Sequence, residues 1–284
     1  NQIAHYGLIA NLLSVPLMGI LVMPAAVLAV CLAPLGQWEL GLWFMEKGLR
    51  WILFVAHAVA GKDGALSHVW APDPSVLPMM ALGLLWIILI KGRARFAGGA
   101  AVVFAALLWA QTTRPALLVA DNGGLIGLQT AEGRVLSKPR GSGFVAGIWL
   151  ENDGWPVDQV IAAAREGINT VDRQSRIALG AWDIVQITGK TALAATNGCG
   201  GADVLISNQE IADDRPCEVF DLNRLRRTGA LAFDLNANGT LRIETAHHVA
   251  GDRLWNTRQG PAQGAVTLDL SDHGTIATDF VADQ

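Results

Sequence analysis

The chain has 284 residues and is 51% hydrophobic, which is high for a wholly soluble protein. Residues 1–113 hold six basic and four acidic side chains, whereas residues 114–284 hold fifteen and twenty-one, giving net charges of +2 and −6. The acidic C-terminal part is therefore not a general nucleic-acid binder, because phosphate affinity comes from clustered Lys and Arg. A local basic patch remains open there, at Arg224, Arg226 and Arg227.

The first apolar run extends from Tyr6 to Leu35 and contains no charged residue. At about 1.5 Å per residue, a helix of this length crosses a bilayer core of about 30 Å. Pro16 and Pro24 each lack a backbone donor, so we expect a kink or a break at both. Because the chain enters this run at once and without an initiator methionine, we expect it to be a fragment or a chain that lacks its N-terminal part; a complete processed protein is the alternative.

One polar side chain, Asn11, lies inside this apolar run. It can line a polar pathway, or it can form a hydrogen bond with a neighbouring helix. The sequence leaves both interpretations open.

The next segment, residues 37–61, is apolar with four regularly spaced polar side chains. The intervals of seven, four and seven residues place them on one face of a helix: Glu39, Glu46, Arg50 and His57. Glu46 and Arg50 also form an i,i+4 pair. Three formal charges on one face are costly at the centre of a bilayer, so we expect this helix to lie in the interface or to line a polar cavity. An amphipathic helix packed on a neighbour is the alternative.

A loop at residues 62–75 leads to two shorter apolar runs, residues 76–90 and 96–110. The basic segment Lys91-Gly-Arg-Ala-Arg95 separates them, so the pattern predicts a transmembrane hairpin with a basic turn. By the positive-inside rule this turn faces the cytoplasm. The chain then leaves the membrane at Arg114 on the other side, and we expect residues 114–284 to form an extracytoplasmic domain, periplasmic if the cell has two membranes.

Residues 114–284 predict a soluble domain with many short strands and a few helices, which is typical of a layered α+β or α/β fold. The predicted helices are residues 144–151, 157–166 and 221–227, the last with Asp221 as N-cap. The predicted strands are residues 116–121, 125–129, 134–137, 181–188, 191–196, 202–207, 230–235, 240–246 and 265–270. Strands 181–188 and 191–196 are expected to form a hairpin around Gly189-Lys190.

The three cysteines differ in their surroundings. Cys199 and Cys217 flank the predicted strand 202–207 and are candidates for a disulfide in an oxidising compartment. Cys31 lies in the first apolar run, where we expect a small buried hydrophobic residue.

No catalytic motif is apparent. A binuclear metallohydrolase needs several converging His and Asp ligands, but this half of the chain has only His247, His248 and His273, without ligand spacing. We expect His247 and His248 to face opposite sides of a strand. The nucleophile elbow, the P-loop and the dinucleotide fingerprint are absent from the sequence. The sequence therefore assigns no catalytic, cofactor-binding or metal-ligating residue, and no cofactor.

Several motifs carry a family resemblance. The N-terminal run Asn-Gln-Ile-Ala-His-Tyr-Gly-Leu-Ile-Ala-Asn-Leu-Leu-Ser-Val-Pro-Leu is followed by Val22-Met-Pro24, the charge-striped segment and the hairpin with its basic turn. Further on come Cys199-Gly-Gly-Ala-Asp-Val-Leu-Ile-Ser, Arg215-Pro-Cys217 and Asp221-Leu-Asn-Arg-Leu-Arg-Arg-Thr-Gly-Ala-Leu-Ala. In this order the motifs resemble the ComEC-type competence proteins, the inner-membrane channels of DNA uptake in natural transformation.

The resemblance implies a C-terminal part of such a channel, with membrane helices in residues 1–113 and a metallo-β-lactamase-like domain in residues 114–284. In metal-binding relatives a His-His-Gly segment follows the strand that corresponds to residues 202–207, but here Asn208-Gln-Glu follows it. No catalytic residue therefore carries over. The implied partners are single-stranded DNA, membrane lipids, other proteins of the competence machinery, the upstream membrane spans and further copies of the chain.

Three functional hypotheses follow. The first is a channel component that passes single-stranded DNA inward, with a non-catalytic outer domain. The second is a membrane-tethered nuclease or hydrolase acting on incoming DNA outside the cytoplasm. The third is a membrane-anchored scaffold. The residues that would line the pathway in the first hypothesis are Asn11, Glu46, Arg50 and His57.

Overall fold

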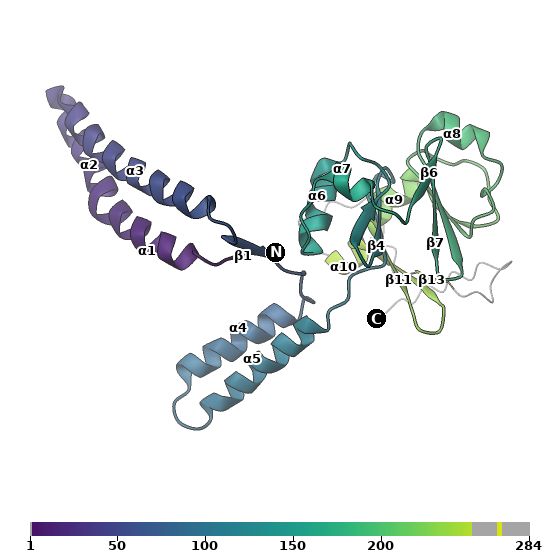
Figure 1. Cartoon of the computed structure of the whole chain (residues 1–284), viewed down its shortest axis with the longest axis horizontal. Coiled ribbons are helices and arrows are strands. Elements are labelled where there is room, and N and C mark those ends of the chain that lie inside the picture. The colour runs from purple at the N-terminus through teal and green to yellow at the C-terminus, as the bar shows by residue number, and fades with distance from the viewer. Residues whose placement is uncertain (1, 252–265, 269–284) are drawn as a thin grey trace. The chain divides into compact units, whose positions relative to one another are not determined.

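The computed structural model describes residues 2–251 and 266–268, and the chain divides into two compact units, Asn1–Val69 and Trp70–Gln284 (Figure 1). The first unit is a pair of long helical segments closed by a short two-stranded sheet. Its elements are β1 (Gln2–Ala4), α1 (Gly7–Leu17), a π-helical turn (Met18–Val22), α2 (Met23–Leu32), a 3-10 turn (Ala33–Leu35), α3 (Trp38–Ala60) and β2 (Leu66–His68).

The first apolar run forms one continuous helical segment, Gly7–Leu35, of 29 residues. Pro16 lies in the last turn of α1 and Pro24 in the first turn of α2, with the π-helical turn between them. A proline is tolerated in a first helical turn, where its missing N–H would have no partner. The wider π-helical turn absorbs the local mismatch in hydrogen bonding, so the segment continues through both prolines without a break.

α3 packs antiparallel along α1 and α2 at close range. A Cβ atom added at Gly41 would lie 2.4 Å from the backbone nitrogen of Ala29, and one at Gly48 would lie 2.6 Å from a methyl carbon of Val22. Further along, the indole Nε1 of Trp51 donates to the carbonyl oxygen of Leu13 at 3.3 Å. The two glycines therefore allow the helices to approach to backbone contact, as small residues do at helix interfaces in membranes.

The open end of this helix pair is joined by β1 and β2, which pair antiparallel from Gln2↔His68 to Ala4↔Leu66. The side chain of His5 lies 2.6 Å from the hydroxyl of Ser67. β2 falls inside the segment that the sequence indicated only as a loop, and β1 precedes the first apolar run. Neither was predicted, because three residues carry too little periodicity to predict a strand.

The second unit begins with an antiparallel helical hairpin, α4 (Val76–Leu89) and α5 (Arg95–Ala110), joined by the basic turn. The helices cross at Gly83 and Gly98, where a Cβ at Gly98 would lie 2.6 Å from the carbonyl oxygen of Gly83. Within the described residues, only Gly7–Leu35 is long and apolar enough to be a candidate membrane span; α4 and α5 are shorter apolar helices.

The two compact units divide before the hairpin, between Val69 and Trp70. Hydrogen bonds explain this grouping. The indole of Trp109 donates to the carbonyl oxygen of Trp70 at 3.0 Å, and Trp70 forms a β-bridge with Asp153. The backbone N–H of Ala71 donates to the carbonyl oxygen of Asn152 at 2.9 Å. Both ends of the hairpin are thereby attached to the domain that follows.

Within the described residues, that domain contains two sheets. The first, in the order β13-β12-β11-β3-β4-β5, is antiparallel throughout. The second, in the order β10-β9-β8-β7-β6, has parallel pairs at β8–β9 and β9–β10. The strands are β3 (Leu117–Val119), β4 (Ile126–Thr130), β5 (Gly133–Leu136), β6 (Asn169–Val171), β7 (Gln174–Leu179), β8 (Trp182–Ile187), β9 (Val204–Ser207), β10 (Glu218–Phe220), β11 (Leu231–Leu235), β12 (Leu241–Thr245) and β13 (Val266–Leu268).

The main core lies between the two sheets. Apolar side chains of both form one cluster, and the rings of Phe220 on β10 and Phe233 on β11 meet edge to face at 6.2 Å. The helices α6 (Gly143–Asn152) and α7 (Gln159–Ala163) cover the outer face of the first sheet through a second cluster. The helix α8 (Lys190–Ala195) and the disulfide-bearing loop cover the second sheet. The domain is thus an α+β fold with two central sheets and helices outside them.

Several local predictions were wrong. Residues 191–196 were expected to form a strand, but α8 occupies this segment, since alanine-rich sequence favours helix. The strands β6, β7 and β10 were not predicted. His247 and His248 lie on a short helix, α10 (Ala246–Ala250), because the Thr245 side chain accepts from the backbone N–H of His248 and ends β12. By contrast, α9 (Leu222–Thr228) has the expected N-cap, Asp221.

Candidate functional site

The polar side chains of α3 lie along the face opposite its packing face. The buried residues of this helix are Gly41, Gly48 and Val55, spaced by seven, and they contact α1 and α2. At 100° per residue, Glu39, Glu46, Arg50 and His57 lie about half a turn away, and all four are exposed. We call these four residues the polar stripe. The structure therefore brings them together on one surface that the rest of the first unit leaves open.

Within the stripe, charges are partly paired. Arg50 Nη2 lies 2.5 Å from Glu46 Oε1, with the two side chains 69% and 49% exposed. The Nδ1 atom of His57 lies 2.7 Å from the carbonyl oxygen of Leu53 on the preceding turn. The Glu46–Arg50 pair and the Nε2 atom of His57 therefore lie on the exposed side of the helix.

Asn11 is also exposed, but it lies on α1. Because the polar stripe is turned away from α1, the structure does not bring Asn11 into it. The two features form separate polar positions on the helix pair.

The loop after β9 is where the family resemblance implies metal ligands. Here the side chain of Asn208 accepts a hydrogen bond from the backbone N–H of Gly189 at 2.8 Å, and Gln209 Nε2 donates to the carbonyl oxygen of Asn208. These amides connect β9 to the start of α8. Within residues 2–251 and 266–268, no group of three or more His, Cys, Asp or Glu side chains is arranged to hold a metal ion. The residues at this edge do not fit a binuclear metal centre. His273 lies outside the described residues.

The arginines of α9 do not form an open basic patch. Arg224 Nη2 lies 2.5 Å from Glu218 Oε1, and its guanidinium lies 4.0 Å from the ring centre of Phe220. Arg226 lies 3.2 Å from Glu210. With two of the three charges offset by carboxylates, this surface lacks the clustered excess charge that phosphate binding requires.

Cys199 and Cys217 form a disulfide with a Cα–Cα distance of 6.2 Å. Both are buried among side chains of β8 and β9, where the bond links the segment before β9 to the segment before β10. Cys31, expected to be buried, is exposed on α2.

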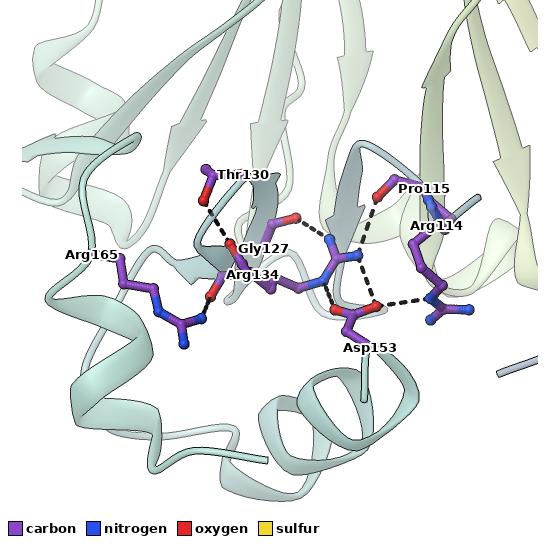
Figure 2. Close-up of polar contacts among 8 residues, drawn as sticks. Arg114, Pro115, Gly127, Thr130, Arg134, Asp153 and Arg165 are labelled. Carbon is purple, nitrogen blue, oxygen red and sulfur yellow. Dashed lines mark hydrogen bonds and ion pairs between the residues drawn. The ribbon is translucent and has the colours of Figure 1, made fainter. Parts of the chain in front are cut away.

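One buried ionic cluster was not predicted from the sequence (Figure 2). Arg134 on β5 is fully buried; its guanidinium contacts the carboxylate of Asp153 and donates to the carbonyl oxygens of Gly127 and Pro115. Arg114 lies 2.8 Å from the same carboxylate. Burial lowers the pKa of Arg134, while Asp153 acts in the opposite direction. A lone arginine in an otherwise apolar strand was the only sequence signal.

The cluster is structural in character. It lies where the chain enters the domain at Arg114 and Pro115, and its carboxylate belongs to the residue that ends α6. Every donor of the buried guanidinium that faces the cluster is matched by an acceptor, which is the condition for tolerating a buried charge. It therefore fixes the entry point of the chain and presents no open reactive group.

Comparison with known proteins bears on the helical part of the chain. Residues 1–95 match the family model for the competence protein. The match includes α1 to α4 and the basic turn, so the resemblance to ComEC-type competence proteins is confirmed over this part of the chain. Together with the 29-residue apolar helix it fits a membrane association. No curated protein and no solved structure matches the chain.

Proposed function

We propose that the chain is part of an inner-membrane channel for the uptake of single-stranded DNA during natural transformation. The observation that carries the proposal is the polar stripe on α3, inside the region that matches the competence family. α1 and α2 supply the length of a membrane span, and α3 packs on them with its glycine face.

In a bilayer, the side chains of the polar stripe must be shielded from the lipid hydrocarbon. Charged groups within membranes face the interior of a bundle or a water-filled cavity, because exposing them to hydrocarbon is costly. The stripe points away from the only helices packed on α3 within the described residues. Upstream membrane spans or further copies of the chain would cover it, and a hydrated pathway for DNA would run along it, where Arg50 offers a cation to phosphate.

The sidedness follows from the basic turn between α4 and α5. Lys91, Arg93 and Arg95 would hold this turn in the cytoplasm if the hairpin crosses the membrane. The domain after Arg114 would then lie outside the cytoplasm. The disulfide of this domain supports that location, because such bonds persist in oxidising compartments.

For the outer domain we propose a metallo-β-lactamase-like fold without catalytic activity. Two sheets packed face to face with helices outside support the fold. The side-chain amides of Asn208 and Gln209, which hold the loop after β9, support the loss of a metal site. Such a domain would bind or guide DNA or partner proteins of the competence machinery.

The channel role is tested by complementation. A deletion strain expressing the Arg50→Gln or Glu46→Gln variant is expected to take up less labelled DNA than the parent. The matched control is Lys47→Gln, which removes a charge from the same helix at a residue that lies beside the Trp43 ring and off the stripe. Unimpaired uptake in a strain that lacks the chain altogether would leave the scaffold hypothesis as the better account.

Two further measurements separate the remaining alternatives. Reporter fusions after Ile90, Arg95 and Arg114 should place only the first two on the cytoplasmic side. Stoichiometric zinc or manganese in the purified protein, together with EDTA-sensitive nuclease activity, would favour the membrane-tethered hydrolase.

A further inference from the structure

The helices α6 and α7 carry apolar side chains on their outer side as well as on the side that contacts the sheet. Inward, Ala146, Trp149, Leu150 and Ala162 belong to the buried cluster under the first sheet. Outward, a second set is exposed, with Phe144 at 82%: Phe144, Ile148, Trp155, Val160 and Ile161. We call these five residues the α6–α7 patch. A surface helix of a soluble domain normally presents polar residues outward, so this patch indicates a partner.

The two helices that carry the patch are joined at their first turns. The amide of Gln159, at the start of α7, donates to the carbonyl oxygens of Lys138 and Gly141 just before α6. A Cβ at Gly143 would lie 3.9 Å from Gln159 Oε1, so the first turns of both helices lie side by side. At the other end, the backbone N–H of Trp155 donates to the carbonyl oxygen of Leu150 at 3.0 Å, which holds the backbone of Trp155 at the C-terminal end of α6.

The position of α6 in the chain's connections suggests which partner this is. Its C-cap, Asp153, bridges to Trp70 and pairs with Arg114, the residues on either side of the α4–α5 hairpin. Only four peptide units separate the end of α5 at Ala110 from Arg114, which is at most about 14 Å of extended chain. Trp109, in the last turn of α5, is closer still, because its indole is bonded to Trp70.

We propose that the α6–α7 patch docks on the lipid surface beside the membrane hairpin, with Trp155 at the level of the headgroups and Phe144 against the acyl boundary. The inference rests on the proposed membrane insertion of α4 and α5. Part of the patch lies on α6, whose C-cap Asp153 is bonded to the residues that flank that hairpin, Trp70 and Arg114. The indole of Trp155 has an apolar body and a polar N–H, which favours the headgroup depth. Docking would orient the outer domain on the membrane.

The test is spin-label accessibility in the full chain, reconstituted as one copy per phosphatidylcholine nanodisc. In a Cys31→Ala background, single cysteines are introduced at Ile148 and Val160 in the patch, at Val103 on α5 and at Val171 on β6. Val103 and Val171 are equally exposed in the structure, at 61% each. Relaxation by oxygen, which partitions into lipid, is compared with relaxation by a water-soluble nickel chelate.

Labels at Ile148 and Val160 are expected to collide several-fold more with oxygen relative to nickel than the label at Val171, approaching the ratio at Val103. If Val103 reports lipid while the patch labels match Val171, the docking inference fails and the membrane hairpin stands. If the label at Val103 is exposed to water, both the docking inference and the proposed membrane insertion of α4 and α5 fail. Patch labels shielded from oxygen and nickel alike would show a protein partner in place of lipid and would also overturn the inference.

Discussion

The guanidinium of Arg134 on β5 and the carboxylate of Asp153 at the end of α6 form a buried ion pair, with Arg134 Nη2 3.3 Å from Asp153 Oδ1. Both side chains are almost completely removed from solvent. The pair connects the first sheet to the helix that covers it, and through Arg114 to the residue at which the chain leaves the hairpin. Its free energy therefore depends on three segments that are distant in sequence.

Replacing Asp153 with Asn is expected to lower the free energy of unfolding of the C-terminal domain by about 3–5 kcal/mol, because Arg134 would remain buried without its counter-charge. Pulse proteolysis of the detergent-solubilised chain in urea measures this loss. The matched control is Glu244→Gln, which removes the partner of the half-exposed Arg242 and should cost less than about 1 kcal/mol. Adding Arg134→Met to the Asp153→Asn variant should recover part of the loss. Equal effects of the two single changes would contradict the assignment.

Removing the disulfide with Cys199→Ala and Cys217→Ala is expected to destabilise the same domain by about 3 kcal/mol, because it closes a loop with a sequence separation of 18. The same proteolysis assay applies, with Cys31→Ala as the control that removes an exposed cysteine. Thiol counting under denaturing, non-reducing conditions should detect one free thiol in the parent chain. Three free thiols would mean that the bridge does not form in the cell.

The crossing of α4 and α5 is tested with two adjacent glycines. A Cβ at Gly98 would lie 2.6 Å from the Gly83 carbonyl oxygen, whereas a Cβ at Gly99 meets nothing within 4 Å. Gly98→Val should therefore destabilise the hairpin by about 1–3 kcal/mol through overpacking, and Gly99→Val should have little effect. Amide hydrogen exchange of residues 76–110 should accelerate in the first variant alone. Similar exchange in both would show that the helices do not meet at this point.

Asp234 on β11 gives a pH-dependent prediction. Burial raises the pKa of Asp234, and a hydrogen bond from Ala116 opposes this only in part. Because the folded state prefers the protonated form, stability falls as the pH rises past the ordinary value of 3.8, and the loss is complete above the raised pKa. Asp234→Asn should therefore be more stable than the parent at neutral pH, and the difference should vanish below the ordinary value of 3.8. If the stability difference between the variant and the parent grows toward acid pH, the pKa of Asp234 is not raised by folding.

Strong local patterns in the sequence determined much of the helical part. The apolar runs on either side of the basic turn form α4 and α5. Apolar runs of this length favour helix, and the charged residues lie at the turn between them. The intervals of α3 already placed its polar side chains on one face. Asp221 was identified as an N-cap because its side-chain oxygen can satisfy a free backbone N–H in the first turn of a helix.

Other features depended on tertiary structure. The alanine-rich segment at residues 190–195 favours helix, but a helix of only six residues is not stable alone, and its packing on the second sheet holds it in place. The packing face of α3 appears only once Gly41 and Gly48 meet α2 and the π-helical turn. Arg134 and Asp153 are 19 residues apart, and only the fold removes water from both and places their charges in contact. Sequence periodicity reports which face of an element is apolar, but the partner of a buried charge is decided by the packing of distant segments.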